Sequence, residues 1–101
     1  MAFHLRRTRD GAGDSGSRSE AIQWNEDGSF NKVISHRPTV GCSMRVGSIT
    51  ARSYDNQDYW LTTVVSEILE EISNEDTQYV RFKTGNSEYE WWNGLYPKVD
   101  N

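Results

Sequence analysis

The clearest alternation of apolar and polar positions along the chain lies between Tyr79 and Trp92. At its centre, Gly85-Asn86 predicts a two-residue hairpin turn, because both residues tolerate a positive φ. With that turn at the tip, one face is apolar and the other carries opposite charges. Such cross-strand pairs contribute roughly 0.2–1 kcal/mol each, and a one-residue slip would lose them all. The predicted pairs are Thr84/Ser87, Lys83/Glu88, Phe82/Tyr89, Arg81/Glu90, Val80/Trp91 and Tyr79/Trp92, with Val80, Phe82, Tyr89 and Trp91 on the apolar face.

Two further segments follow a β pattern. Residues 21–34 predict a first hairpin around the turn Asn25-Glu26-Asp27-Gly28, since Asp-Gly is a good turn signal. Residues 40–46 then alternate as a half-buried strand, and the parity of the apolar positions flips at Gly47, which predicts a bulge or a sharp bend there. The candidate core residues of the first hairpin are Ile22, Trp24, Phe30 and Val33.

Residues 61–72 fit two structures. Their apolar positions form one helical stripe, but Thr62-Thr63-Val64-Val65 is a β-branched run, which favours a strand. Glutamates would also crowd the carboxyl end of a helix, where the dipole disfavours negative charge. We favour a strand that forms a meander with the 79–92 hairpin, and keep the helix open.

Residues 1–20 predict a disordered arm, because they are rich in Gly, Ser, Arg and Asp and have no apolar period. Residues 21–101 then form the single domain. Arg6, Arg7 and Arg9 make a small basic cluster, which either reaches a phosphate or an acidic partner or is simply a solvated tail.

The second half of the chain resembles a small protein family. Thr62-Thr63-Val64-Val65, Phe82-Lys83-Thr84 and Asn86-Ser87-Glu88-Tyr89 are similar to a pattern in small phage and bacterial SH3-like β-barrel proteins. The resemblance implies an all-β fold, in which a small antiparallel sheet curls into an SH3-like barrel. It also implies a phage or mobile-element origin, and carries over no functional residue.

Composition narrows the chemistry. Apolar residues make up 35% of the chain, and large aromatic rings supplement this small supply. There is no apolar run long enough for a membrane span and no pattern of a signal peptide, so we expect a cytoplasmic protein of the host cell. The single Cys42 predicts a buried thiol in a reducing compartment rather than a nucleophile.

No enzymatic chemistry is evident. His4 and His36 have no metal-ligand spacing around them, and no Gly-rich loop precedes a helix. Paired acids such as Asp55/Asp58 and Glu70/Glu71 are common in solvated loops. We therefore expect no enzyme, no cofactor and no metal. A domain this small supplies only ~3–5 kcal/mol from its core, so a homo-oligomer is compatible with the sequence.

The charge favours a protein partner. Residues 46–101 hold four basic and ten acidic side chains, so we expect a partner with a basic surface. Aromatic residues on the polar segment 52–60 would anchor it, although Trp60 could instead cover the core. The function expected first is inhibition of a host defence or nucleic-acid-processing protein. The predicted partner-binding residues are Tyr54, Asp55, Asp58, Tyr59, Trp60, Glu70 and Glu71.

Two alternatives stay open. A nucleic-acid-binding module would stack bases on Tyr79 and Trp92 beside Arg81 and Lys83, which share one face in the predicted register. The acidic Glu88 and Glu90 share that face as well, and an acidic domain is a poor general ligand for phosphates. The other alternative is a virion or assembly component.

Overall fold

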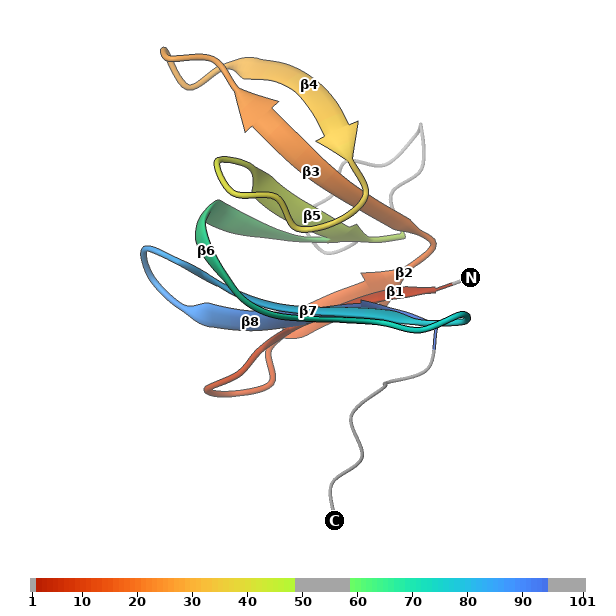
Figure 1. Ribbon diagram of the computed structural model, residues 1–101. Helices are drawn as coiled ribbons and strands as arrows, with labels where there is room; N and C mark the ends of the chain where they lie inside the picture. Colours follow the sequence, from red (N-terminus) through yellow and green to blue (C-terminus); the bar gives the residue numbers. More distant parts are fainter. Residues whose placement is uncertain (1, 49–58, 95–101) are drawn as a thin grey trace.

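The computed structural model describes residues 2–48 and 59–94, which form one eight-stranded antiparallel sheet and no helix (Figure 1). The strands follow the order β2-β1-β8-β7-β6-β5-β3-β4. An all-β fold is therefore confirmed. The strands are β1 (Phe3–Arg7), β2 (Gly13–Gly16), β3 (Arg18–Trp24), β4 (Phe30–Ser35), β5 (Ser43–Gly47), β6 (Tyr59–Ser73), β7 (Gln78–Thr84) and β8 (Glu88–Asn93).

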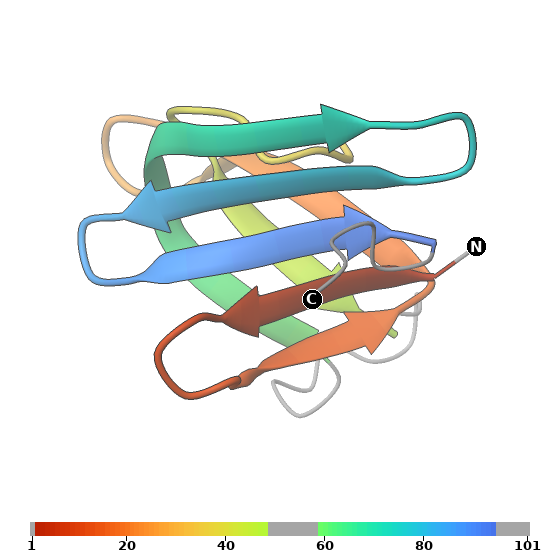
Figure 2. The same ribbon diagram turned by 60° about the horizontal axis from the view of Figure 1, so that its bottom comes forward.

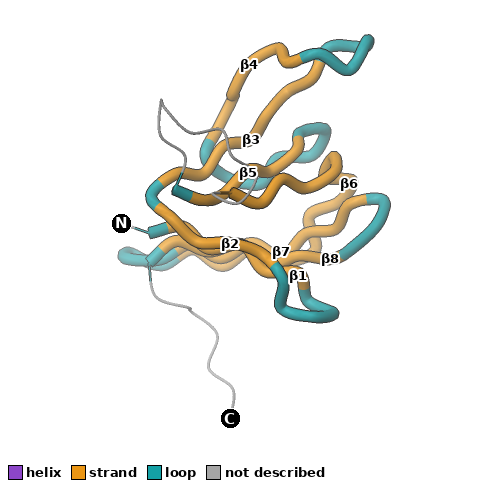
Figure 3. The backbone as a smooth tube through the Cα atoms, turned by 180° about the vertical axis from the view of Figure 1, so that it is seen from behind, coloured by secondary structure: helices purple, strands orange, loops and turns teal. Residues whose placement is uncertain are grey.

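The sheet bends at β6 and folds over itself into two layers (Figures 1 and 3). The first part of β6 pairs with β5, and the part from Val65 onward pairs with β7. We call β2, β1, β8, β7 and the second part of β6 the hairpin layer (Figure 2). The first part of β6 with β5, β3 and β4 is the β3 layer. The expected closed SH3-like barrel is not confirmed, because β2 and β4 are the two ends of the strand order and do not pair.

The core fills the space between the layers. Trp91, Phe82 and Met44 are completely buried, and the Trp91 indole Nε1 donates a hydrogen bond of 2.9 Å to the Ser19 hydroxyl of the opposite layer. Large rings thus replace the missing aliphatic residues, as the composition indicated. The buried cluster comprises Leu5, Ala21, Cys42, Met44, Val46, Val65, Val80, Phe82, Tyr89 and Trp91.

The predicted 79–92 hairpin is confirmed pair by pair from Tyr79/Trp92 to Lys83/Glu88. Its turn differs in chemistry, because neither Gly85 nor Asn86 has a positive φ. Instead, the Thr84 hydroxyl accepts hydrogen bonds of 3.2 Å from the backbone amides of both Asn86 and Ser87. A threonine side chain therefore stabilises the turn where the sequence predicted left-handed residues.

Residues 61–72 are a strand, which confirms the preferred interpretation and the meander β6-β7-β8. Three register shifts each place one extra residue on β6. Because every such bulge resets the alternation, inward positions recur at every third residue: Thr62, Val65 and Ile68. This spacing imitates the stripe of a helix, which is why the pattern was ambiguous.

Residues 1–20 supply β1, β2 and the start of β3, so a disordered arm is not what the structure shows. β1 lies between β2 and β8. Leu5 is buried in the core, and the ring of Phe3 stacks on that of Trp91 with 6.0 Å between the centroids. A polar segment is ordered here because backbone pairing with both neighbours satisfies its amides and carbonyls.

The first hairpin forms with its predicted turn, in which Gly28 has a φ of +87°. Ile22 is buried as predicted, whereas Trp24 is half-buried. The prediction of Phe30 and Val33 as core residues is wrong, since 56% and 41% of their surfaces are exposed. Both lie on β4, the end of the strand order, where their side chains face away from the core.

The strand predicted for residues 40–46 is confirmed from Ser43, where β5 begins, and Cys42, Met44 and Val46 are buried as predicted. Val40, predicted for the same face, is 56% exposed because it lies in the turn before β5. Gly47 ends β5, and a side chain on Gly16 would clash with the Gly47 backbone. The predicted parity flip at Ile49 and Ala51 lies outside the described residues.

Candidate interaction surface

The face of the β3 layer that points away from the core carries a row of three apolar residues and one serine, one residue from each strand. Ile22 of β3 is opposite Val33 of β4 on one side and Ser43 of β5 on the other. Ser43 in turn is opposite Val64 of β6. Directly opposed residues project to the same face of a sheet. Val33, Ile22, Ser43 and Val64 therefore share this outer face.

Bulges bring further apolar side chains to the same face. On β4, one extra residue separates Phe30 from Lys32, so Phe30 and Val33 both project outward although three positions separate them. On β6, the extra residue between Leu61 and Val64 has the same effect. Bulges re-aim side chains in this way. We define the outer patch as Trp24, Phe30, Val33, Leu61 and Val64, with the buried Ile22 as its floor.

Trp24 fixes the shape of the outer patch. Its indole Nε1 donates a hydrogen bond of 2.8 Å to the Ser43 hydroxyl, and its ring meets the Phe30 ring edge-on at 6.5 Å. Trp24, Phe30, Ile22 and Arg45 line a depression of about 320 Å³. Aromatic side chains held rigidly over an apolar floor are typical of protein interfaces.

Charged groups border the outer patch. Arg45 forms an ion pair of 2.8 Å with Glu20, and its guanidinium carbon lies 5.6 Å from the centre of the Tyr59 ring. Arg18 begins β3 at one end of the face. Glu26 and Asp27 follow β3 at the other end, in the exposed turn to β4.

The structure separates the predicted partner-binding residues rather than gathering them. Tyr54, Asp55 and Asp58 lie outside the described residues. Tyr59 and Trp60 are the first two residues of β6, so their side chains project to opposite faces of the sheet.

Trp60 packs against the core, where its indole Nε1 lies 3.4 Å from the Tyr89 hydroxyl and the Arg7 guanidinium covers its ring at 5.2 Å. This position agrees with the alternative in which Trp60 covers the core. Glu70 and Glu71 lie toward the far end of β6, and pair with Arg81 and Arg37 at 3.5 Å each.

The four residues of the nucleic-acid alternative do share the outer face of the hairpin layer. Tyr79 is nevertheless completely buried, and its hydroxyl donates a hydrogen bond of 2.6 Å to Glu90. Arg81 pairs with Glu88 at 3.2 Å as well as with Glu70, and Lys83 lies 3.8 Å from Glu67. The cations on this face are thus neutralised by neighbouring carboxylates.

Two residues of this face were missed by the sequence prediction: His4 and Arg6 of β1. The His4 ring stacks on Trp92 at 5.0 Å, and Arg6 lies over the same indole at 5.5 Å. Arg6 also forms an ion pair of 2.7 Å with Glu90, which is only 8% exposed. Only the pairing of β1 with β8, separated by over eighty residues, creates this arrangement.

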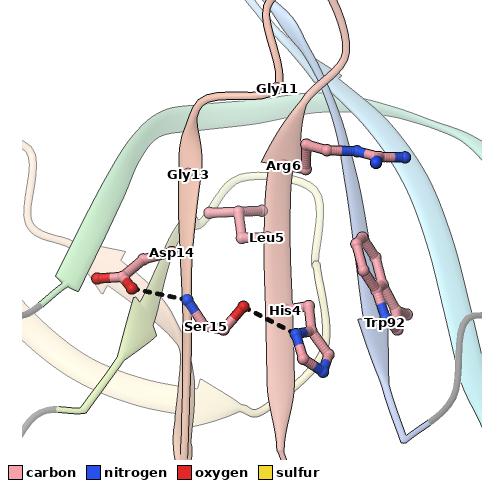
Figure 4. Close-up of a pocket in the computed structure, with 8 residues that line it drawn as sticks. All are labelled: His4, Leu5, Arg6, Gly11, Gly13, Asp14, Ser15 and Trp92. Atoms are coloured by element: carbon pink, nitrogen blue, oxygen red, sulfur yellow. Dashed lines mark hydrogen bonds between the residues drawn. The ribbon is translucent and has the colours of Figure 1, made fainter.

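A depression of about 330 Å³ lies beside this stack (Figure 4). The His4 Nδ1 is 2.8 Å from the Ser15 hydroxyl, and the Ser15 amide donates to Asp14. Burial lowers the pKa of His4, so the imidazole is neutral at pH 7. Hydrogen bonds therefore link three of the residues that line this depression: His4, Ser15 and Asp14.

The described parts of the chain hold no candidate metal cluster. No group of three or more His, Cys, Asp and Glu side chains could hold a metal ion in residues 2–48 and 59–94. Cys42 is buried, and its burial raises the pKa of the thiol, which disfavours the reactive thiolate. None of the described residues forms a helix able to cross a membrane.

Comparisons with family models, curated proteins and solved structures find no match to this chain. The outer patch is therefore identified from its own geometry, and the resemblance to small phage and bacterial barrel proteins stays an expectation from the sequence.

Proposed function

We propose that the protein is a non-enzymatic binding protein that acts by protein–protein contact through the outer patch. The observation that supports this proposal is the use of bulges in β4 and β6 to place four exposed apolar side chains on the face of Ile22 and Trp24. A sheet face that needed only to be soluble would carry polar residues at these positions.

The energy available from this face suits binding. Full burial of one large apolar side chain contributes roughly 1.5–3 kcal/mol, and the side chains of the outer patch are about half exposed already. Burying Phe30, Val33, Leu61 and Val64 would then contribute roughly 1 kcal/mol each. The rigid Trp24 adds an anchor that loses little side-chain entropy on binding.

The expected inhibitory role fits this mode of action. A non-enzymatic binding protein can inhibit its partner by covering part of the partner's surface. Inhibition of a host protein by such occlusion is the activity we propose. The acids Glu70 and Glu71 are already paired, so we assign them to solubility and orientation of the partner rather than to the main contact.

A capture experiment tests the proposal. The immobilised protein would be exposed to a lysate of the source cells, and Phe30→Asp and Leu61→Asp would be compared with the wild type. We expect both variants to lose the captured protein, because each places a charge in the apolar contact. Glu75→Lys, in the turn between β6 and β7, is the control and should retain it. Equal capture by all four proteins would reject the outer patch.

An oligonucleotide titration at two salt concentrations addresses the nucleic-acid alternative. The paired cations of the hairpin layer predict no salt-sensitive binding. Binding that disappears in Arg81→Ala or Trp92→Ala would reverse this expectation.

A further inference from the structure

The two ends of β3 carry charges of opposite sign. Arg18 stands at its first position and faces outward, because it is opposite Gly47 and its neighbour Ser19 is buried toward the core. Glu26 and Asp27 stand just beyond its last position. No described residue forms an ion pair with Arg18 or Glu26. The outer patch is therefore basic at one end and acidic at the other.

The acidic end stays charged. The Ser29 hydroxyl and amide both donate hydrogen bonds to the Asp27 carboxylate, at 2.6 and 2.9 Å, and these bonds lower the pKa of Asp27. Glu26 is exposed in the same turn. The hydrogen bonds to Ser29 thus favour the charged form of Asp27 at this end of the face, beside Glu26.

Ile22 lies midway between the two ends, four residues from Arg18 and four from Glu26. At about 3.3 Å per residue, Arg18 lies roughly 13 Å from Ile22 along the strand direction. Glu26 lies in the turn beyond the opposite end of β3. Ile22 also belongs to the row Val33, Ile22, Ser43 and Val64 that crosses the layer. A line along this row divides the face into a basic half and an acidic half around an apolar centre.

Resting on the proposed function, we infer that a second copy of this chain binds the outer patch, face to face, with a two-fold axis along the row of Ile22. This rotation sets β3 of the two copies antiparallel. It places Arg18 of each copy against Glu26 and Asp27 of the other, twice in the dimer. An axis parallel to β3 would instead bring Arg18 against Arg18, and like charges oppose that arrangement.

The same operation matches the apolar parts. Val33 and Val64 lie on the axis and meet their own copies, with the buried Ile22 beneath the contact. Trp24 comes over the Arg45–Glu20 pair of the partner, where a guanidinium near an indole face is favourable. Aligned packing of two antiparallel sheets is a common way to cover such faces.

The size of the face predicts a weak dimer. Four strands 4.8 Å apart and nine residues of length give roughly 500 Å² per copy, below the ~800 Å² of a standard interface. We therefore expect dissociation constants from about ten micromolar to the millimolar range, and an equilibrium that shifts with protein concentration.

Sedimentation equilibrium from micromolar to millimolar protein, with charge reversal, tests this inference. Arg18→Glu brings like charges together twice, and Glu26→Lys places a lysine against Arg18 at both contacts, so each variant alone should weaken the dimer ~tenfold or more. An equimolar mixture of the two variants restores opposite charges at both contacts. We expect this mixture to regain association close to that of the wild type, as a heterodimer.

Arg9→Glu and Glu75→Lys are the matched controls, because they make the same charge changes away from the outer patch. Circular dichroism would verify that every variant is folded. A wild type that stays monomeric at millimolar concentration, or a mixture that does not regain association, would overturn the inference. If capture of another protein is still lost in Phe30→Asp while the wild type is monomeric, the proposed function stands and the second copy is the wrong occupant. Unchanged capture and unchanged association in Phe30→Asp would reject both.

Discussion

Gly28 and Gly85 lie in two hairpin turns that the sequence predicts equally well, but their backbone conformations differ. Gly28 has a φ of +87°, a conformation that costs other residues roughly 1–2 kcal/mol. Gly85 has no positive φ, and a Cβ there would meet nothing within 4 Å. Residue type alone predicted both turns, but not which turn depends on glycine.

Substitution by alanine should separate them. Gly28→Ala should lower the free energy of unfolding by roughly 1–2 kcal/mol. Gly85→Ala should leave it unchanged or raise it by up to about 1 kcal/mol, because alanine restricts the unfolded chain. Urea denaturation of both variants measures the difference. Equal destabilisation would show that Gly85 also needs a left-handed backbone.

At the scale of single strands, β6 owes its bend to side chains that complete the hydrogen bonding at its bulges. The Thr62 hydroxyl accepts a hydrogen bond of 3.0 Å from the buried Met44 amide, at the point where the ladder between β5 and β6 slips. A side chain thus replaces a backbone carbonyl. Without it, the Met44 amide would be buried unpaired.

Thr62→Val keeps the shape of the side chain and removes the hydroxyl. We expect a loss of roughly 1–3 kcal/mol in the free energy of unfolding, the cost of an unsatisfied buried amide. Thr63→Val is the matched control, because Thr63 is exposed and a β-branched residue suits the strand. Thermal or urea unfolding measures both variants. Equal stability of Thr62→Val and Thr63→Val would contradict the role of the Thr62 hydroxyl.

The elements differ in how far the sequence predicts them. The register of the β7-β8 hairpin follows from a local turn and a strict alternation, so all its pairs could be assigned. The bulges of β4 and β6 leave no such signal: they turned Phe30 and Val33 outward and gave β6 a period of three. Which apolar face the opposite layer covers depends on distant strands, and so the outer patch could not be foreseen.

On the scale of the whole molecule, the hairpin layer joins distant parts of the chain, because β1 pairs with β8. Its residues alternate between the core and the outer face, with Leu5 inward and Arg6 outward against Glu90. Polar composition predicted disorder for this segment, because one of the two strands that order it, β8, is more than eighty residues away.

Leu5→Ala tests whether β1 is part of the folded structure. Removing a buried leucine side chain typically costs 2–5 kcal/mol, and we expect a loss of about that size in urea unfolding. Arg9→Ala, in the exposed turn between β1 and β2, should change the free energy by less than about 0.5 kcal/mol. Identical urea unfolding curves for the two variants would instead support the prediction that residues 1–20 are disordered.

The pairing of β1 with β8 has a consequence for synthesis. On the ribosome, β1 emerges more than eighty residues before β8, so it cannot pair with β8 until that strand has been made, and its apolar side chains stay accessible to chaperones until then. Such distant pairing also predicts slow refolding, on the millisecond-to-second scale of β proteins rich in non-local contacts.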